Sequence, residues 1–171
     1  FRRVLFRSVG LAGVSGNGQR ELLAALSGED ARALPESIEL LGQPAGQLDP
    51  AHRRNLGLHF VPEERLGRGA VPTLSLAHNL LLTRNESLGP MGLIKPQALS
   101  LQARSIIERF GVKAAGPQAA ARSLSGGNLQ KFIVGREISA SPRLLLISQP
   151  TWGVDVGAAA QIRSEILALR D

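Results

Sequence analysis

Leu124-Ser125-Gly126-Gly127-Asn128 stands directly before an apolar run that predicts a helix from Leu129 to Ile138. Two consecutive glycines let a backbone approach an anion with no Cβ in the way. A helix behind them directs free N–H groups and the positive end of its dipole at that anion. The stretch therefore predicts a phosphate-binding turn, with an ordinary Ser-Gly-Gly turn as the alternative.

A second landmark follows along the chain. A predicted buried strand, Leu144–Ile147, leads into Ser148-Gln149-Pro150-Thr151 and then Gly153-Val154-Asp155. Together the two landmarks resemble the ATP-binding-cassette (ABC) ATPases, whose signature motif reads LSGGQ and stands here as LSGGN. In that family the Walker B strand usually ends in Asp-Glu-Pro-Thr and a D-loop follows. The resemblance extends over nearly the whole chain, from Val9 to Asp171.

The front of the chain has the spacing of a P-loop, G-x-x-x-x-G-K-[ST]. Val9–Val14 predicts a short buried strand and Gln19–Leu26 a helix, and the loop between them is Gly13-Val14-Ser15-Gly16-Asn17-Gly18-Gln19-Arg20. Gln19 replaces the lysine that reaches the phosphates. Arg20 replaces the hydroxyl that ligates magnesium, which puts a cation where a cation binds. The loop predicts residual nucleotide binding or a plain glycine turn, and no hydrolysis.

The Walker B positions also lack the residues that the family uses for catalysis. Ser148 replaces the aspartate that supports magnesium, and Gln149 replaces the glutamate that polarises the attacking water. A carboxamide can hold a water molecule but cannot accept its proton. Four positions have thus lost the charge or hydroxyl that phosphoryl transfer uses. We therefore expect no intact catalytic residue in this site.

Glu63 is the best match to the glutamine of the ABC Q-loop, at the end of a predicted strand in His59-Phe60-Val61-Pro62-Glu63-Glu64-Arg65. A glutamate that faces a nucleotide phosphate repels it unless magnesium or Arg65 intervenes. A solvated Glu-Glu-Arg turn is the alternative.

Three motifs narrow the resemblance: AGVSGNGQ, VPEER and LSGGN. They are similar to the second, C-terminal and degenerate nucleotide-binding domain of tandem ABC ATPases that serve simple-sugar and nucleoside importers. The form of Gln149–Ala158 looks more like the nucleoside (basic membrane protein) branch. Trp152 stands where arginine is commoner, as either an exposed aromatic at a domain contact or a packed one.

The resemblance implies a division of labour between two cassettes. Ser125, Gly126, Gly127 and Asn128 would grip the γ-phosphate of ATP held by an intact N-terminal domain of the same polypeptide, and Asp155 would couple the sites. Gly13–Arg20 would form the weak site, with Mg²⁺ mainly at the partner site. Further implied partners are membrane permease subunits and, indirectly, a substrate-binding protein, at the cytoplasmic face of the bacterial inner membrane. A non-hydrolysing regulatory or scaffold module is the alternative.

The expected fold is an α/β, P-loop NTPase-like ABC domain, truncated at both ends, with a helical insertion at about 74–121. The insertion is too short for a soluble ABC protein that acts on DNA or ribosomes. Predicted elements are a polar hairpin at Ser37–Gln43, a short helix at Pro50–Arg54, a strand at Gly57–Val61, and helices at Gln97–Phe110 and Ala158–Arg170, with a loop at Gly89–Gly92.

The composition fits one globular domain of 171 residues, 43% of them hydrophobic. The absence of Cys excludes disulfides and thiolate metal sites, and the three His show no metal-ligand spacing. Three of the six net positive charges belong to Arg2, Arg3 and Arg7. These lie in residues 1–8, interpreted as a non-native leader, with a native basic strand as the alternative. Basic residues do not cluster with aromatics, so no nucleic-acid partner is expected.

Overall fold

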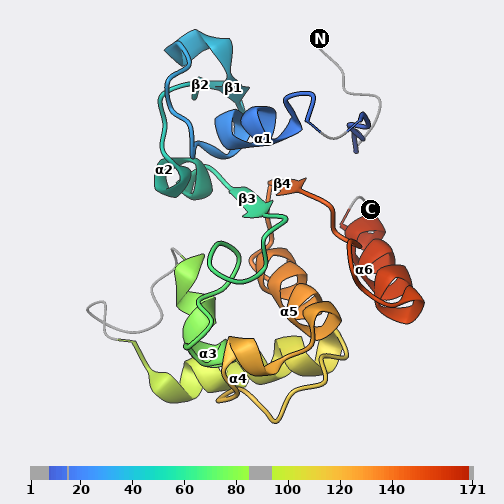
Figure 1. The fold of residues 1–171 in the computed structure, drawn as a ribbon. Coiled ribbons are helices and arrows are strands. Elements are labelled where there is room, and N and C mark those ends of the chain that lie inside the picture. Colours follow the sequence, from blue (N-terminus) through green and yellow to red (C-terminus); the bar gives the residue numbers. More distant parts are fainter. Residues whose placement is uncertain (1–7, 15, 85–93, 170–171) are drawn as a thin grey trace.

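A computed structural model describes residues 8–14, 16–84 and 94–169. Two short parallel strands lie at the centre, β3 (Leu58–Val61) and β4 (Leu144–Ile147) (Figure 1). Leu58 lies opposite Leu144, and Val61 opposite Ile147. The N-terminal elements lie on one side of this pair and the helical elements on the other, so β3 and β4 join the two halves of the domain.

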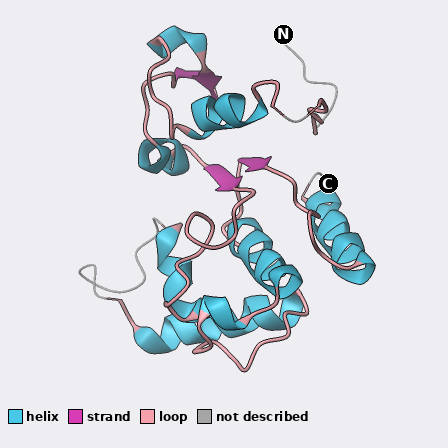
Figure 2. Ribbon diagram, in the orientation of Figure 1, coloured by secondary structure: helices cyan, strands magenta, loops and turns pink. Residues whose placement is uncertain are grey.

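The N-terminal half has helix α1 (Gln19–Ser27), the 3-10 helix η1 (Pro35–Ser37), the hairpin β1 (Glu39–Leu40) and β2 (Gln43–Pro44), and helix α2 (Pro50–Asn55). Figure 2 shows this hairpin apart from the β3–β4 pair. Arg53 of α2 is buried, and its guanidinium donates to the carbonyl oxygens of Ala25 and Leu26 at 2.6 and 2.8 Å. A cation at the carbonyl end of α1 is favoured by the helix dipole, so Arg53 fixes the helix that begins at the glycine loop.

The helical half holds most of the apolar core. It consists of α3 (Leu76–Asn79), the 3-10 helices η2 (Leu80–Leu82) and η4 (Ala121–Ser123), α4 (Pro96–Arg109) and α5 (Gly126–Ile138). Phe110 and Phe132 are fully buried in it. Gly135 lets Phe110 approach α5, because a Cβ at Gly135 would lie 2.7 Å from the Phe110 ring. Helix α6 (Val156–Ala168) packs against α5.

A buried charged network ties β3 to α5. Nδ1 of His59 lies 2.8 Å from one carboxylate oxygen of Glu137, and Nε of Arg136 donates to the other at 2.7 Å. Arg136 also donates to the carbonyl oxygen of Asn79. Burial by itself would raise the pKa of Glu137, but the charges and hydrogen bonds of Arg136 and His59 outweigh it and lower the pKa. Glu137 is therefore held as an ionised, fully bonded carboxylate inside the protein.

Most predicted elements are confirmed to within a few residues. The helix expected at Gln97–Phe110 is α4, and the one expected at Ala158–Arg170 is α6, of which Arg170 lies outside the described residues. The loop expected at Gly89–Gly92 also lies outside them. The helices α3, η2 and α4 lie within the stretch 74–121 that was predicted to be a helical insertion. Residues 1–7, within the predicted leader, are not described.

The prediction of a buried strand at Val9–Val14 is wrong. This segment has no regular structure, and Val9, Leu11 and Val14 are largely exposed. In the part of the chain that the structure describes, the parallel sheet consists of β3 and β4, and neither pairs with this segment. A strand needs a neighbour for its backbone N–H and C=O groups, so apolar composition alone does not make one.

Candidate functional site: a glycine loop and a capped signature turn

A pocket of about 620 Å³ brings together most of the residues predicted for nucleotide binding at the front of the chain, Asn17 excepted. Its lining includes Gly13, Gly16, Gly18, Gln19, Arg20, Glu63, Ser148 and Gln149. These residues come from the loop before α1 and its first turn, the loop after β3 and the end of β4. The pairing of β3 with β4 brings the last two of these segments together, since the backbone N–H of Ser148 donates to the carbonyl oxygen of Val61 at 2.9 Å.

The glycine loop has a backbone that only glycine adopts readily. Gly16 has φ 92° and Gly18 φ 89°, and a Cβ at either position would meet open space. Gly18 is the N-cap of α1 and provides no side chain to cap the first turn. Free N–H groups at a helix start form a ready anion site. The backbone therefore fits a phosphate group.

Gln19 occupies part of this loop with its own side chain. Its Nε2 donates to the carbonyl oxygen of Val14 at 2.8 Å, and its Oε1 accepts the N–H of Asn17 at 3.0 Å. Both bonds are exposed to solvent. The neutral amide thus bonds the loop to itself and engages an N–H that an anion would otherwise accept, so a ligand here competes with Gln19.

Arg20 and Glu63 form a loose ion pair across the pocket, with 4.0 Å between Nη2 and Oε2. The sequence left Mg²⁺ or Arg65 as the group that would neutralise Glu63; in the structure Arg65 instead bonds to Gln130 and to Trp152. At the two positions that the family uses for Mg²⁺, this pocket has a guanidinium, which repels a cation, and a serine, whose hydroxyl carries no negative charge. Among residues 8–14, 16–84 and 94–169, no group of three acidic, His or Cys side chains can hold a metal.

The chain turns sharply where β4 ends. Gln149 has φ 47°, an uncommon conformation for a residue with a side chain, and its carbonyl oxygen accepts the N–H of Trp152 at 3.1 Å. Ser148 and Gln149 both line the pocket. Neither side chain is a proton acceptor at neutral pH, so the pocket has no general base at the positions that the family uses.

The signature turn has a side-chain helix cap. Ser125 is the N-cap of α5, and its Oγ accepts from the backbone N–H of Asn128 at 3.5 Å and from Nδ2 of Asn128 at 2.9 Å. Oδ1 of Asn128 in turn accepts the N–H of Lys113 at 2.8 Å. A serine hydroxyl has two acceptor positions and one proton to donate. Both acceptor positions are engaged, which leaves the Ser125 hydroxyl as a donor.

Asp155 caps the next helix beside the signature turn. Its Oδ1 accepts the N–H of Ala158 at 2.9 Å at the start of α6. A Cβ at Gly127 would lie 3.5 Å from Oδ2 of Asp155, so the two motifs are neighbours. The hydrogen bond from Ala158, together with the positive charge of Lys131, lowers the pKa of Asp155. Asp155 is therefore an anion next to the signature glycines.

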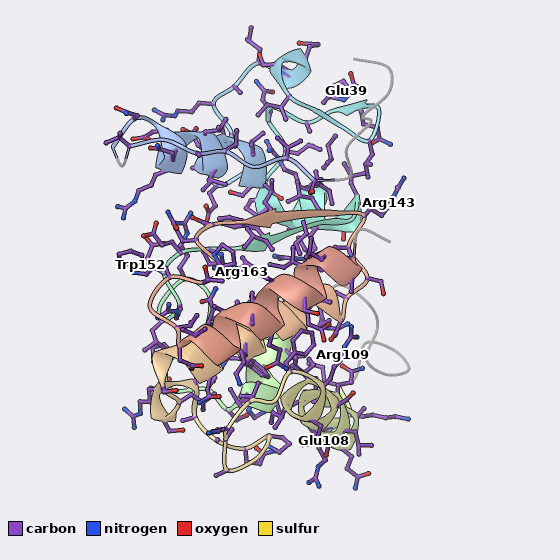
Figure 3. All side chains as sticks on the ribbon, turned by 90° about the vertical axis from the view of Figure 1, so that its right-hand side faces the viewer. Glu39, Glu108, Arg109, Arg143, Trp152 and Arg163 are labelled. Atoms are coloured by element: carbon purple, nitrogen blue, oxygen red, sulfur yellow. The ribbon has the colours of Figure 1, made fainter. Side chains whose placement is uncertain are left out.

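Two features were not found from the sequence. Arg65 donates to Gln130 in α5 and to the carbonyl oxygen of Trp152. It thus joins the loop after β3 both to the signature helix and to the loop that leads to Asp155. No local sequence pattern predicts the direction in which the Arg65 side chain points. Trp152, for which two environments stayed open, is 67% exposed at the periphery of the molecule (Figure 3).

The fold of the domain has a counterpart among solved structures. A dimeric ATP-binding cassette, MJ0796, in a post-hydrolysis state bound to ADP and phosphate, superposes with a TM-score of 0.72 and 18% identity. The alignment covers 92% of this chain and 67% of that one. The chain folds as an ATP-binding-cassette domain. At this identity the likeness concerns the fold alone, and it confirms the P-loop NTPase-like class expected from the sequence.

In sequence, the cassette is similar to import ATP-binding proteins. The chain is 38% identical over 161 residues to the xylose import ATP-binding protein XylG of Burkholderia ambifaria, covering 94% of this chain and 31% of that protein. It is 37% identical over 165 residues to the nucleoside import ATP-binding protein NupA of Lactococcus lactis, covering 95% and 32%. The chain thus spans about a third of the length of these relatives. No protein-family model matches it.

Proposed function

We propose that this cassette domain supplies the signature half of a composite ATP site and leaves hydrolysis to a partner cassette. The observation that carries the proposal is the contrast between its two phosphate-binding turns. The turn at Ser125–Asn128 has a side-chain cap and keeps the serine and both glycines of its motif, whereas the pocket around Gln19 and Arg20 has lost the groups that phosphoryl transfer uses.

The hydroxyl of Ser125 is suited to a phosphate oxygen. Both of its acceptor positions are engaged by Asn128, so its proton is available to be donated to a ligand. Gly126 and Gly127 add backbone N–H groups at the positive end of α5, with no Cβ to keep a phosphate at a distance. Donors fixed before the ligand arrives need no reorganisation when charge develops on the γ-phosphate of the partner's ATP.

The pocket around the glycine loop is the weak site of the pair. Gly16 and Gly18 retain a backbone that fits a phosphate, and Arg20 adds a positive charge. Gln149 offers no base for an attacking water, and the guanidinium of Arg20 disfavours Mg²⁺ in the pocket. Nucleotide bound here is held without turnover, and Mg²⁺ acts at the partner's site.

The wider assignment is to a bacterial importer. The domain would be the second, C-terminal cassette of a tandem polypeptide that acts with permease subunits at the cytoplasmic face of the inner membrane and, through them, with a substrate-binding protein. The matched relatives import sugars and nucleosides. We favour a nucleoside cargo from the form of Gln149–Ala158, with simple sugars second. No helix within the described residues is long and apolar enough to cross a membrane.

The test is Ser125→Ala in the full-length ATPase assembled with its permeases. Loss of the donated hydrogen bond to the partner's phosphate is expected to lower transport and ATP hydrolysis by about 10²-fold, as for other preorganised donors. Asp49→Ala is the matched control, since it also removes a helix N-cap, that of α2, and lies outside both turns. It is expected to keep transport. Unchanged transport by Ser125→Ala would favour the scaffold alternative.

Two further measurements separate the parts of the proposal. The chain alone is expected to hydrolyse no ATP, and magnesium-dependent turnover that follows the purified protein through chromatography contradicts that. The gene sequence upstream of Val9 tests the tandem arrangement. An in-frame cassette with G-x-x-x-x-G-K-[ST] supports it, and a gene without one contradicts it.

A further inference from the structure

Arg65 links three segments that the proposed mechanism treats separately. It lies in the loop after β3, and its Nε donates to Oε1 of Gln130 at 3.0 Å, in the second turn of α5. Its Nη2 donates to the carbonyl oxygen of Trp152, at the start of the D-loop. One guanidinium thus bonds both to the signature helix and to the loop that leads to Asp155.

The glycines of both motifs make room for this side chain. A Cβ at Gly126 would lie 2.8 Å from Nη1 of Arg65, and a Cβ at Gly153 would lie 3.4 Å from Nη2. Gln130 is 1% exposed, and its bond to Arg65 is partly buried. The rigid, planar fork of arginine can bond to two acceptors at a fixed angle, which the flexible, single-ended ammonium of lysine cannot do.

The same loop also reaches the other site. Glu63, two residues before Arg65, lines the glycine-loop pocket and pairs with Arg20. Arg68, three residues after it, pairs with Glu29 just beyond the end of α1. The segment from Glu63 to Arg68 therefore contacts the weak site, α1 and the signature turn together.

We propose that Arg65 is the positioning residue that holds the Ser125–Asn128 turn and the Gly153–Asp155 loop at one fixed spacing, so that both meet the partner cassette as a unit. This rests on the proposed role of the signature turn. Arg65 itself does not line the glycine-loop pocket, and its contacts are with Gln130 and Trp152. It acts on the partner's reaction through those contacts.

The experiment replaces Arg65 in the full-length ATPase with its permeases. Arg65→Met is expected to lower kcat for ATP hydrolysis about 10- to 100-fold, because a misplacement near 1 Å at the signature turn has an effect of that size. The KM for ATP is expected to change less than about twofold, since Arg65 acts in the closed state and not in the first encounter with ATP. Arg65→Lys, which can reach one of the two acceptors, is expected to fall between.

A double-mutant cycle with Gln130→Leu tests the contact itself. If Arg65 acts through Gln130, the double variant is expected to lose no more activity than Arg65→Met alone. Arg32→Met is the matched control, an exposed arginine paired with Asp30 away from both turns, and it is expected to keep wild-type kcat. Thermal melting of each variant separates a loss of kcat from a loss of folded protein.

Three results overturn the inference: a wild-type kcat in Arg65→Met, a loss of kcat that the melting curves fully account for, or effects of Arg65 and Gln130 that multiply independently. If Arg65→Met does not fold, Arg65→Lys decides in the same way, by a lowered kcat at unchanged melting temperature. Loss of activity in Ser125→Ala with wild-type activity in Arg65→Met overturns this inference and leaves the proposed function standing. Wild-type activity in both overturns both.

Discussion

The two phosphate-binding turns of this domain share a plan and differ in how they are held. Each has glycines at the start of a helix. The signature turn is capped by Ser125 and stands on a helix whose residues from Leu129 to Ile138 are mostly buried. The glycine loop has no side-chain cap and is held by exposed bonds from Gln19. The comparison teaches that two turns with the same glycine plan can differ in what holds them: a side-chain cap and a buried helix in one, and the exposed bonds of a neutral amide in the other.

The largest effect on stability is expected near the C-terminal end of the signature helix α5. Glu137→Ala leaves the buried charge of Arg136 without its main partner, so we expect unfolding in urea to require about 3–5 kcal/mol less. Glu108→Ala, on the exposed side of α4, is the control and is expected to change stability by less than about 0.5 kcal/mol. Similar stability for the two variants would contradict the buried anchoring of this turn.

A pair of glycine substitutions compares the two turns directly. Gly126→Ala puts a methyl group where Arg65 lies and is expected to lower ATP hydrolysis by the full-length protein at least about tenfold. In Gly16→Ala the new methyl group would contact no other atom, so the expected cost comes only from the positive φ at this position and is about 1–2 kcal/mol in stability. We expect that variant to keep the partner's hydrolysis. Steady-state ATPase assays of the two variants measure this difference. A larger loss of ATP hydrolysis in Gly16→Ala than in Gly126→Ala would contradict the comparison of the two turns.

Low pH is expected to destabilise the protein through two carboxylates, those of Glu137 in the signature helix and Asp155 beside the signature turn. The pKa values of Glu137 and Asp155 are lowered in the folded protein, so the unfolded chain binds protons first as the pH falls. Their stabilisation is complete above their ordinary values, 4.5 and 3.8, and is lost as the pH falls through the lowered ones. The urea midpoint, followed between about pH 6 and pH 3, is expected to drop. Asp155→Asn should flatten that drop, and an identical pH profile for this variant speaks against the assignment.

The smallest effect is expected at Gln19. Both of its bonds are exposed, so Gln19→Ala is expected to change stability by no more than about 0.5 kcal/mol. It frees the N–H of Asn17, so binding of a fluorescent ATP analogue at the glycine loop is expected to tighten slightly. Asp30→Ala serves as a surface control. Weaker binding by Gln19→Ala would show that the amide contacts the ligand and does not compete with it.

Motifs with a local physical signal could be predicted from the sequence. The order of glycine turn, helix, apolar strand and second turn correctly indicated the fold, and the helix from Pro96 to Arg109 is where its apolar spacing placed it. Gln19, Arg20, Glu63, Ser148 and Gln149 were expected at one site, and they line one pocket.

What depends on contacts across the chain could not be predicted. The apolar run Val9–Val14 indicated a strand, but a strand also needs a paired neighbour. His59 and Glu137 are 78 positions apart, and only the packing of α5 under β3 brings them together. Arg65 was one of two groups considered for neutralising Glu63, with Mg²⁺ as the other, but its side chain bonds to Gln130 in α5. The direction of a side chain that follows the end of a strand is set by tertiary packing, which cannot be predicted from a single sequence.

The parallel pairing of β3 with β4 has a consequence for biosynthesis. All of residues 62–143 lie between the two strands, so the ribosome completes β3 long before its neighbour exists. Until then, Leu58 and Val61 have no partner strand, and a nascent chain in this state offers an apolar edge to other chains. Helices α3, α4 and α5 all lie between the two strands in the sequence, so they can collapse before β4 is made and shorten the gap that the late strand must close. We therefore expect cotranslational folding to begin in the helices and to finish with the sheet.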